Sequence, residues 1–223
     1  LRNGDEGERV PFTIAGPNVQ NGEIDVIFQI VGVTTRKLAA LSVGDSITDL
    51  CGPLGKPSDI PTLGTGEKAV IIGGGVGTAV AYPTLKSFAA NGIPTDVIAG
   101  FRTADLTILE PEMRPLADNL YITLGNELVT DKLRALLDSG ANYRYILAIG
   151  PVPMMSAVSK IGKEYNIHTV VSLNPIMVDG TGMCGCCRVT VNGKIKFACI
   201  EGPEFDADGV DFAELTARNR TYN

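Results

Sequence analysis

The chain has 223 residues, of which 44% are hydrophobic, and its formal net charge at pH 7 is −6. This composition is sufficient for packed cores, whereas the acidic balance argues against a phosphate-backbone partner, which needs a basic face. The sequence contains no apolar run long enough to cross a bilayer and no signal or transit pattern at its start. We therefore expect a cytoplasmic protein with no nucleic-acid or membrane partner.

The first third of the chain has short apolar or β-branched runs bounded by glycine, proline and asparagine. These runs are "RVPFTIAG", "GEIDVIFQIVG" and "DSITDLCGPLGKP", and they are typical of strands in a small β-barrel. Because the first strand comes so soon after the start of the chain, we expect the barrel to be incomplete at its N-terminal side.

A different period follows residue 66. The strand-like "AVIIGGG", the helical "TAVAYPTLKSFAANG" and the strand-like "PTDVIAGFR" are followed by "TDKLRALLDSG", "YRYILAIG", "PMMSAVSKIGKEY" and "HTVVSLN". This alternation predicts an α/β domain with a doubly wound parallel sheet. We thus predict three units: a β-barrel over 1–66, an α/β domain over 67–173 and a small cysteine-rich domain over 174–223.

The turn "VIIGGGVGTA" lies between a predicted strand and a predicted helix. Its small residues are Gly73, Gly74, Gly75, Gly77 and Thr78. Missing side chains let backbone N–H groups and the helix N-terminus approach a pyrophosphate. A tight turn without a ligand would have the same glycines, so this motif alone leaves both readings open.

A second turn, "AIGPVPMM", ends a later strand of the same sheet and contains Gly150, Pro151 and Met154. Ligands of open α/β sheets bind at the carboxyl edge, so both turns should line one crevice. After the second strand of the domain, Arg102 could pair with a 2′-phosphate and Asp105 could accept a ribose hydroxyl. A solvated arginine in a surface loop is the alternative for Arg102.

The stretch "DGTGMCGCC" begins a set of metal-ligand spacings, Asp179-x4-Cys184-x2-Cys187-x11-Cys199. With cysteine in place of Asp179, this would be the ligand spacing of plant-type 2Fe-2S proteins, and a carboxylate oxygen can also ligate iron. A zinc site, buried thiols and a disulfide are the alternatives, although zinc normally needs two paired knuckles. We place Cys186, which should point away, and Cys51 outside the ligand set.

The order of "RVPFT", "GVTTRKL" and "GPLGKP", followed by the two turns, resembles the ferredoxin-NADP reductase superfamily. By residue pattern alone, these three stretches are strand ends and turns. The resemblance implies an FAD-binding barrel before a pyridine-nucleotide domain. It assigns flavin contacts to Arg9, Pro11, Phe12, Thr13, Gly32, Thr34, Thr35 and Gly52.

The tail "DGTGMCGCCRVTVNGKIKFACIEGPEFD" resembles the small subunit of NADH-dependent reduced ferredoxin:NADP+ oxidoreductase, an electron-bifurcating family that includes sulfide dehydrogenase. The resemblance implies NAD(H), FAD, a 2Fe-2S cluster held by Asp179 and three cysteines, and a large partner subunit with flavin and 4Fe-4S clusters. The related electron-transfer subunit of dihydroorotate dehydrogenase, which has cysteine at the first ligand position, is the alternative enzyme. A zinc-bearing interaction module is the alternative outside enzymes.

Nicotinamide delivers two electrons as hydride, whereas an iron–sulfur cluster accepts one electron at a time. A flavin between them is therefore required, and no side chain needs to act as a general acid or base. We expect the sole histidine, His168, to be structural.

Overall fold

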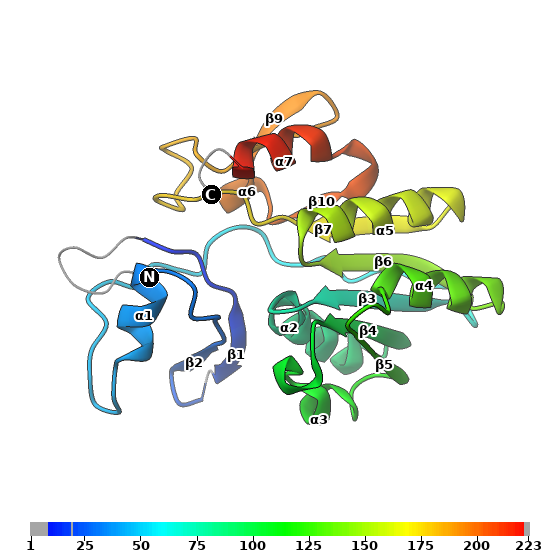
Figure 1. Cartoon of the computed structure of the whole chain (residues 1–223), viewed down its shortest axis with the longest axis horizontal. Helices are drawn as coiled ribbons and strands as arrows, with labels where there is room; N and C mark the ends of the chain where they lie inside the picture. The colour runs from blue at the N-terminus through cyan, green and yellow to red at the C-terminus, as the bar shows by residue number, and fades with distance from the viewer. Residues whose placement is uncertain (1–8, 19, 221–223) are drawn as a thin grey trace.

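A six-stranded sheet lies at the centre of the computed structural model, which describes residues 9–18 and 20–220 (Figure 1). Its order is β10-β7-β6-β3-β4-β5, and all neighbours are parallel except the edge strand β10. The strands are β3 (Lys68–Gly74), β4 (Thr95–Phe101), β5 (Asn119–Leu124), β6 (Tyr143–Ile149), β7 (His168–Ser172) and β10 (Glu204–Asp206).

Helices cover both faces of this sheet, which confirms the predicted doubly wound α/β architecture. The inner strands are apolar on both sides because each side is buried: Ile71 of β3 faces α2, whereas Ile72 faces α4 and α5. The helices and 3-10 turns of this part are α2 (Gly77–Ala90), η1 (Ala104–Leu106), α3 (Glu110–Met113), α4 (Val129–Asp138) and α5 (Val152–Glu164).

The first 66 residues do not form the predicted barrel in the part that the structure describes. They contain one antiparallel pair, β1 (Ile14–Asn18) with β2 (Glu23–Val26), and the helix α1 (Val33–Ala39). The strand expected within residues 45–57 is absent there. We interpreted the stretch "GVTTRKL" as a loop, but it is helical. Thr35 Oγ1 accepts the Gly32 N–H at 2.9 Å, which caps the helix, and Leu38 is buried one turn later.

The N-terminal segment contacts both other parts of the molecule. Lys86 Nζ of α2 donates a hydrogen bond to the Ala15 carbonyl oxygen of β1 at 3.0 Å. Further along, the Lys56 N–H donates to the Gly202 carbonyl oxygen at 2.7 Å. Segments far apart in sequence are thus held together on one side of the sheet.

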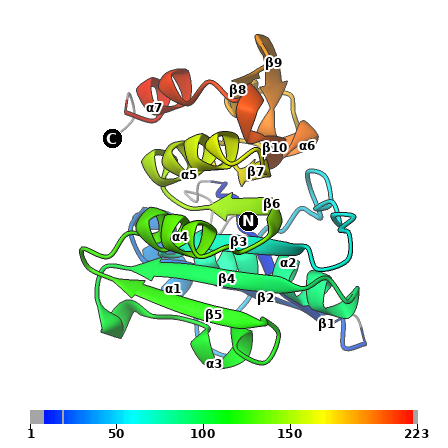
Figure 2. The ribbon, with the colours of Figure 1, turned by 90° about the vertical axis from the view of Figure 1, so that its right-hand side faces the viewer.

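The cysteine-rich segment is continuous with the central sheet, because its strand β10 pairs with β7 (Figure 2). The rest of the segment comprises β8 (Arg188–Val191), β9 (Lys194–Phe197), α6 (Ala198–Glu201), η2 (Ala207–Gly209) and α7 (Phe212–Arg220). The hairpin β8–β9 and helix α7 lie beyond α5. Across residues 9–18 and 20–220, no helix has the length and apolar character needed to span a membrane.

Candidate functional site

Two turns meet at the carboxyl end of the parallel strands. A Cβ atom added at Gly74 would lie 2.7 Å from Met154 Sδ and 2.9 Å from Pro151 Cδ. At Gly77, an added Cβ would collide with the carbonyl oxygen of Ile149. The structure therefore brings the "GGGVGTA" and "GPVPMM" turns together. Gly77 is required because the backbone of the second turn lies against it, whereas Gly74 leaves room for the side chains of Pro151 and Met154.

Gly75 has a different role in the same turn. Its φ is +56°, and an added Cβ would meet nothing within 4 Å, so it faces open space at the N-terminal end of α2. The Gly75 N–H is fixed by the Gly100 carbonyl oxygen of β4 at 2.8 Å. An open, glycine-lined surface before a 14-residue helix is the geometry that suits a pyrophosphate.

Thr78, Gly73 and Arg102 complete this edge of the sheet. Thr78 Oγ1 is buried without a hydrogen-bond partner among the described residues, and a Cβ added at Gly73 would lie 2.7 Å from it. Thr78 is therefore covered by the turn and is not open to a ligand. Arg102 follows β4 directly and is exposed, as is Asp105 in η1. The choice between a 2′-phosphate contact and a solvated arginine stays a prediction.

The predicted flavin residues are spread over the N-terminal segment. The ring centroids of Phe12 and Phe28 lie 5.7 Å apart, so Phe12 packs against a side chain that follows β2. Thr35 Oγ1 accepts from the Val31 and Gly32 N–H groups, and Thr34 is buried. Both threonines therefore stabilise the start of α1. Arg9, Pro11, Thr13 and Gly52 are exposed and free to contact a ligand.

The cysteine loop brings its predicted ligands together in two pairs. Cys187 Sγ and Cys199 Sγ lie 3.2 Å apart, and both residues are buried. Asp179 and Cys184 form the second pair, since Asp179 Oδ2 accepts the Cys184 N–H at 3.0 Å. The loop between them turns at Gly180, Gly182 and Gly185, whose φ values are +75°, +84° and +67°. These left-handed conformations account for the glycines.

Backbone N–H groups lower the pKa values of two side chains in this loop. The Thr181 N–H, followed by contacts from Cys184, lowers the pKa of Asp179. The Cys186 and Asp179 N–H groups lower the pKa of Cys184, whereas burial raises the pKa of Cys199 to about 11. N–H groups directed at thiols are typical of loops that enclose an iron–sulfur cluster.

Cys186 is closer to the predicted ligands than the spacing suggested. The neighbouring Cys184 thiol is the largest cause of the raised pKa of Cys186. The carbonyl oxygen of Cys186 accepts from Arg218 Nη2 of α7 at 3.0 Å. Cys51 is exposed in the N-terminal segment. Sequence spacing could not reveal the Cys184–Cys186 contact, because it depends on how the glycine loop turns.

The donors of this loop fit an iron–sulfur cluster, because its three thiols are the groups that such clusters take as ligands. Within the described ranges, no three or more His, Cys, Asp or Glu residues form a group that could hold a metal ion. The predicted ligands instead form the two pairs described above. Both Asp179 oxygens accept a backbone N–H, yet each keeps a lone pair for a metal.

A doubly wound domain with a glycine crevice, followed by a cysteine loop of this spacing, defines the class of oxidoreductase electron-transfer subunits. Residues 174–211 match the model of the iron-sulfur cluster binding domain of dihydroorotate dehydrogenase B. The chain is 40% identical over 227 residues to the "dihydroorotate dehydrogenase B (NAD(+)), electron transfer subunit homolog" of Thermotoga maritima, covering 100% of this chain and 79% of that protein.

Two further similarities cover the whole chain. An "uncharacterized protein in adh 3′region" of Clostridium beijerinckii is 44% identical over 234 residues, with 79% of that protein covered. A solved structure, described as giving insights into flavin-based electron bifurcation via the NADH-dependent reduced ferredoxin-NADP oxidoreductase, superposes with a TM-score of 0.93 at 39% identity. It covers 100% of this chain and 81% of that chain. The chain belongs to this family of electron-transfer subunits.

Proposed function

We propose that the chain is the small subunit of an electron-bifurcating, NADH-dependent reduced ferredoxin:NADP+ oxidoreductase. It is an oxidoreductase subunit whose cofactors are FAD, an iron–sulfur cluster and NAD(H). The observation that carries the finer proposal is the whole-chain superposition at a TM-score of 0.93, together with an aspartate at the first cluster-ligand position.

Separate groups of residues in this chain would bind NAD(H) and FAD. The open backbone at Gly75 and the N-terminus of α2 would receive the pyrophosphate of NAD(H), with Gly74, Gly150, Pro151 and Met154 closing the crevice. The exposed residues of the N-terminal segment, Arg9 and Thr13 among them, would hold FAD. When bound, the flavin converts a hydride pair into single electrons.

Asp179 and Cys184 would hold one iron of a 2Fe-2S cluster, and Cys187 and Cys199 the other. The two pairs support this division, since Cys187 and Cys199 already lie in thiol contact. The β8–β9 hairpin and α6 fix the second pair in the protein interior. The glycine loop supplies the first pair at the surface, where Cys184 is exposed. Electrons would leave the chain from this exposed side.

An electron-transfer subunit needs a larger partner subunit, which the heteromeric enzymes named among its relatives support. We propose that this partner contains flavin and 4Fe-4S clusters, and that the complex is cytoplasmic. The domain division into residues 1–66, 67–173 and 174–223 stays part of the proposal, with residues 1–8 and 221–223 outside those described.

The family model and the Thermotoga maritima relative favour a second candidate, the electron-transfer subunit of dihydroorotate dehydrogenase B. One experiment separates the two. The complex is purified anaerobically with its natural partner and assayed for NADP+ reduction that requires both NADH and reduced ferredoxin. It is assayed in parallel for NAD+-dependent oxidation of dihydroorotate. The first activity alone supports our proposal, and the second alone replaces it with the alternative.

A further inference from the structure

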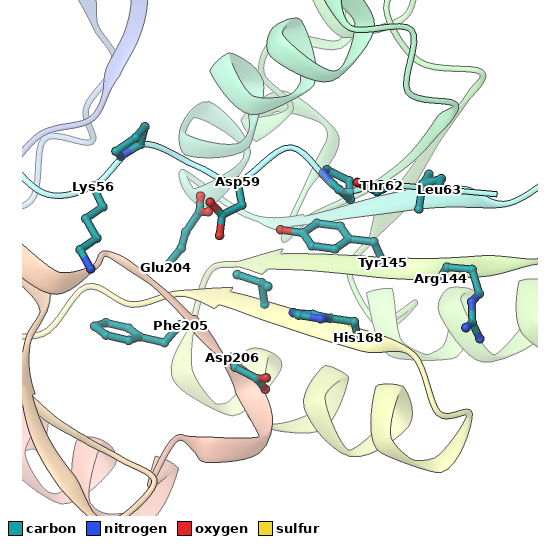
Figure 3. Close-up of a pocket in the computed structure, with 13 residues that line it drawn as sticks. Lys56, Asp59, Thr62, Leu63, Arg144, Tyr145, His168, Glu204, Phe205 and Asp206 are labelled. Carbon is teal, nitrogen blue, oxygen red and sulfur yellow. The ribbon is translucent and has the colours of Figure 1, made fainter.

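A cavity of about 470 Å³ lies between the linker of residues 56–63 and strands β6, β7 and β10 (Figure 3). Its floor includes Tyr145 and His168, whose ring centroids are 5.7 Å apart. Both residues belong to the amino-terminal halves of their strands, whereas the glycine turns lie at the carboxyl ends. The cavity is therefore separate from the nucleotide crevice, and its volume falls within the range of about 300–1,000 Å³ seen for small-molecule sites.

Tyr145 places a polar group in this cavity without a partner. The residue is only 6% exposed, and its hydroxyl has no hydrogen bond within residues 9–18 and 20–220. In Figure 3 the hydroxyl points toward the carboxylates of Asp59 and Glu204, and both of these charges raise the pKa of Tyr145 further, after burial. The hydroxyl therefore faces the cavity as a polar group that can still donate or accept a hydrogen bond.

The carboxylates of Glu204 and Asp59 also have free acceptor positions within the described residues. Glu204 Oε1 accepts from Ser58 Oγ at 2.6 Å, which fixes the side chain, but Oε2 has no partner in the described part of the chain. Asp59 likewise makes no hydrogen bond or ion pair there. Burial raises the pKa of Glu204, and the nearby Asp59 raises it further. Glu204 is half-buried and Asp59 is exposed at the rim of the cavity. Like charges repel each other, so a cation between the two carboxylates would stabilise both.

Among the described residues, neither the lysine nor the arginine at the cavity pairs with the two carboxylates. Arg144 Nε pairs with Glu67 Oε1 at 3.2 Å. Lys56 points away from the two carboxylates in Figure 3, and its charge helps to lower the pKa of Glu201. Asp206, the third acidic residue at the rim, accepts the Asp208 N–H at 3.0 Å. The acceptors of Asp59, Glu204 and Tyr145 are thus left for a ligand.

We propose that this cavity binds an organic cation through a guanidinium or ammonium group held by Asp59, Glu204 and Tyr145. Such groups offer several N–H donors to converging oxygen atoms, and an aromatic floor attracts cations. A metal ion fits less well, since no metal-binding group of three ligands exists among the described residues. The cation comes either from a free small molecule or from an arginine or lysine side chain of the partner subunit. The proposal does not depend on the cofactors.

The test is calorimetric titration of the full chain with agmatine, which has both cationic groups, and with uncharged 1,4-butanediol. Agmatine should bind and butanediol should not. The double variant Asp59→Asn/Glu204→Gln should lower the agmatine affinity by about tenfold or more, the effect of losing charged hydrogen-bond partners. Tyr145→Phe should also weaken binding, and because its hydroxyl has no partner, this variant should fold normally. Glu112→Gln, which removes one exposed charge on α3, should bind like the unmodified chain.

A second titration, on the complex as purified, distinguishes the two sources. Binding of agmatine to the complex identifies a free small molecule as the ligand. Exclusion of agmatine, together with weaker subunit association in the double variant, identifies a partner side chain. The proposal is overturned if agmatine does not bind the chain, if the double variant binds it equally well, or if the complex excludes agmatine while the double variant assembles unchanged.

Discussion

The Sγ atoms of Cys187 and Cys199 lie 3.2 Å apart although the two residues are 12 positions apart in sequence. Cys187 precedes β8 and Cys199 lies in α6, so the β8–β9 hairpin brings them together. Asp179 and Cys184 instead lie in a loop whose path is set by three glycines at positive φ. One ligand pair is therefore fixed by packing and the other by backbone turns.

The ligand assignment predicts opposite behaviour for two neighbouring side chains. Asp179→Ala removes an iron ligand and should make the cluster labile, with loss of iron, sulfide and visible absorption. Cys186→Ala removes a thiol that we place outside the ligand set and should keep all three. Iron and sulfide assays on anaerobically purified variants check this. Loss of the cluster in Cys186→Ala, with an unaltered cluster in Asp179→Ala, would replace Asp179 by Cys186 as the fourth ligand.

Replacing Asp179 by cysteine gives the ligand assignment a second test. Asp179→Cys completes a set of four thiolates at ferredoxin spacing, so the cluster should assemble with a shifted EPR signal and a changed reduction potential, because ligand identity sets both. An EPR signal identical to that of the unmodified protein would mean that residue 179 does not contact the iron.

The nucleotide crevice is tested by two matched glycines at opposite ends of α2. Gly75 and Gly92 both have positive φ, +56° and +67°, and an added Cβ at either meets nothing within 4 Å. Each alanine variant should therefore cost a similar free energy of unfolding, about 1–2 kcal/mol. Only Gly75→Ala should lose NADH affinity, by about tenfold or more, the equivalent of about 1.4 kcal/mol. Equal NADH binding in the two variants would place the nucleotide elsewhere.

Nucleotide choice is tested at Arg102. If this exposed side chain pairs with a 2′-phosphate, Arg102→Ala should weaken NADP(H) binding by about 1.5–3 kcal/mol, as expected for a charge-assisted hydrogen bond, and should not affect NAD(H). We expect the unmodified protein to prefer NAD(H). Titrations of both nucleotides measure this, and a clear preference of the unmodified protein for NADP(H) would contradict the assignment.

Two buried tyrosines on β6 should differ in their effect on stability. The Tyr143 hydroxyl donates to Asp96 Oδ2 at 2.6 Å in the core, whereas the Tyr145 hydroxyl has no partner in the described chain. Tyr143→Phe should lower the free energy of unfolding by about 1.5–3 kcal/mol, the value for hydrogen bonds to charged groups. Tyr145→Phe should cost much less in the absence of a ligand. Chemical denaturation of both variants checks the difference.

Tyr143 should also make the stability of the protein depend on pH. Burial, followed by the hydrogen bond to Asp96, raises the pKa of Tyr143 above its usual value of 10.0. The unfolded chain therefore loses this proton first, so the stability contributed by Tyr143 is complete below pH 10 and declines as pH rises above that value. Tyr143→Phe should lose stability less steeply over this range. Parallel slopes for variant and unmodified protein would contradict a raised pKa.

Much of the α/β domain could be predicted because its strands are continuous apolar runs with period changes at glycines. The run "AVIIGG" is buried on both sides of the sheet, as predicted for an inner parallel strand. The helix α1 was missed, and its stretch interpreted as a loop, because the β-branched residues Val33, Thr34 and Thr35 have low helix propensity. The hydrogen bond between the Gly32 N–H and Thr35 Oγ1 favours the helix. The edge strand β10 has three residues, two of them acidic, and its pairing with β7 depends on tertiary contacts alone.

Some features of the candidate sites could likewise be predicted from the sequence, and others could not. The meeting of the two glycine turns could be predicted, because both turns follow strand ends at the carboxyl edge of one sheet. Spacing suggested Asp179, Cys184, Cys187 and Cys199 as one ligand set, but not their division into two pairs. The contact between Cys184 and Cys186 and the cavity beneath the linker could not be predicted. The first depends on the path of a glycine loop, and the second depends on where residues 56–63 cross the sheet beside β10.

The central claim is that electrons pass from NADH through FAD to a cluster held by Asp179, Cys184, Cys187 and Cys199. The most direct measurement is anaerobic titration of the cofactor-loaded protein with NADH, followed by low-temperature EPR. We predict that NADH produces the signal of a reduced 2Fe-2S cluster in the unmodified protein, and that the signal is absent from Cys187→Ala, in which NADH still bleaches the flavin absorption. A flavin that NADH bleaches without any cluster signal in the unmodified protein, or a full signal in Cys187→Ala, would contradict this electron path.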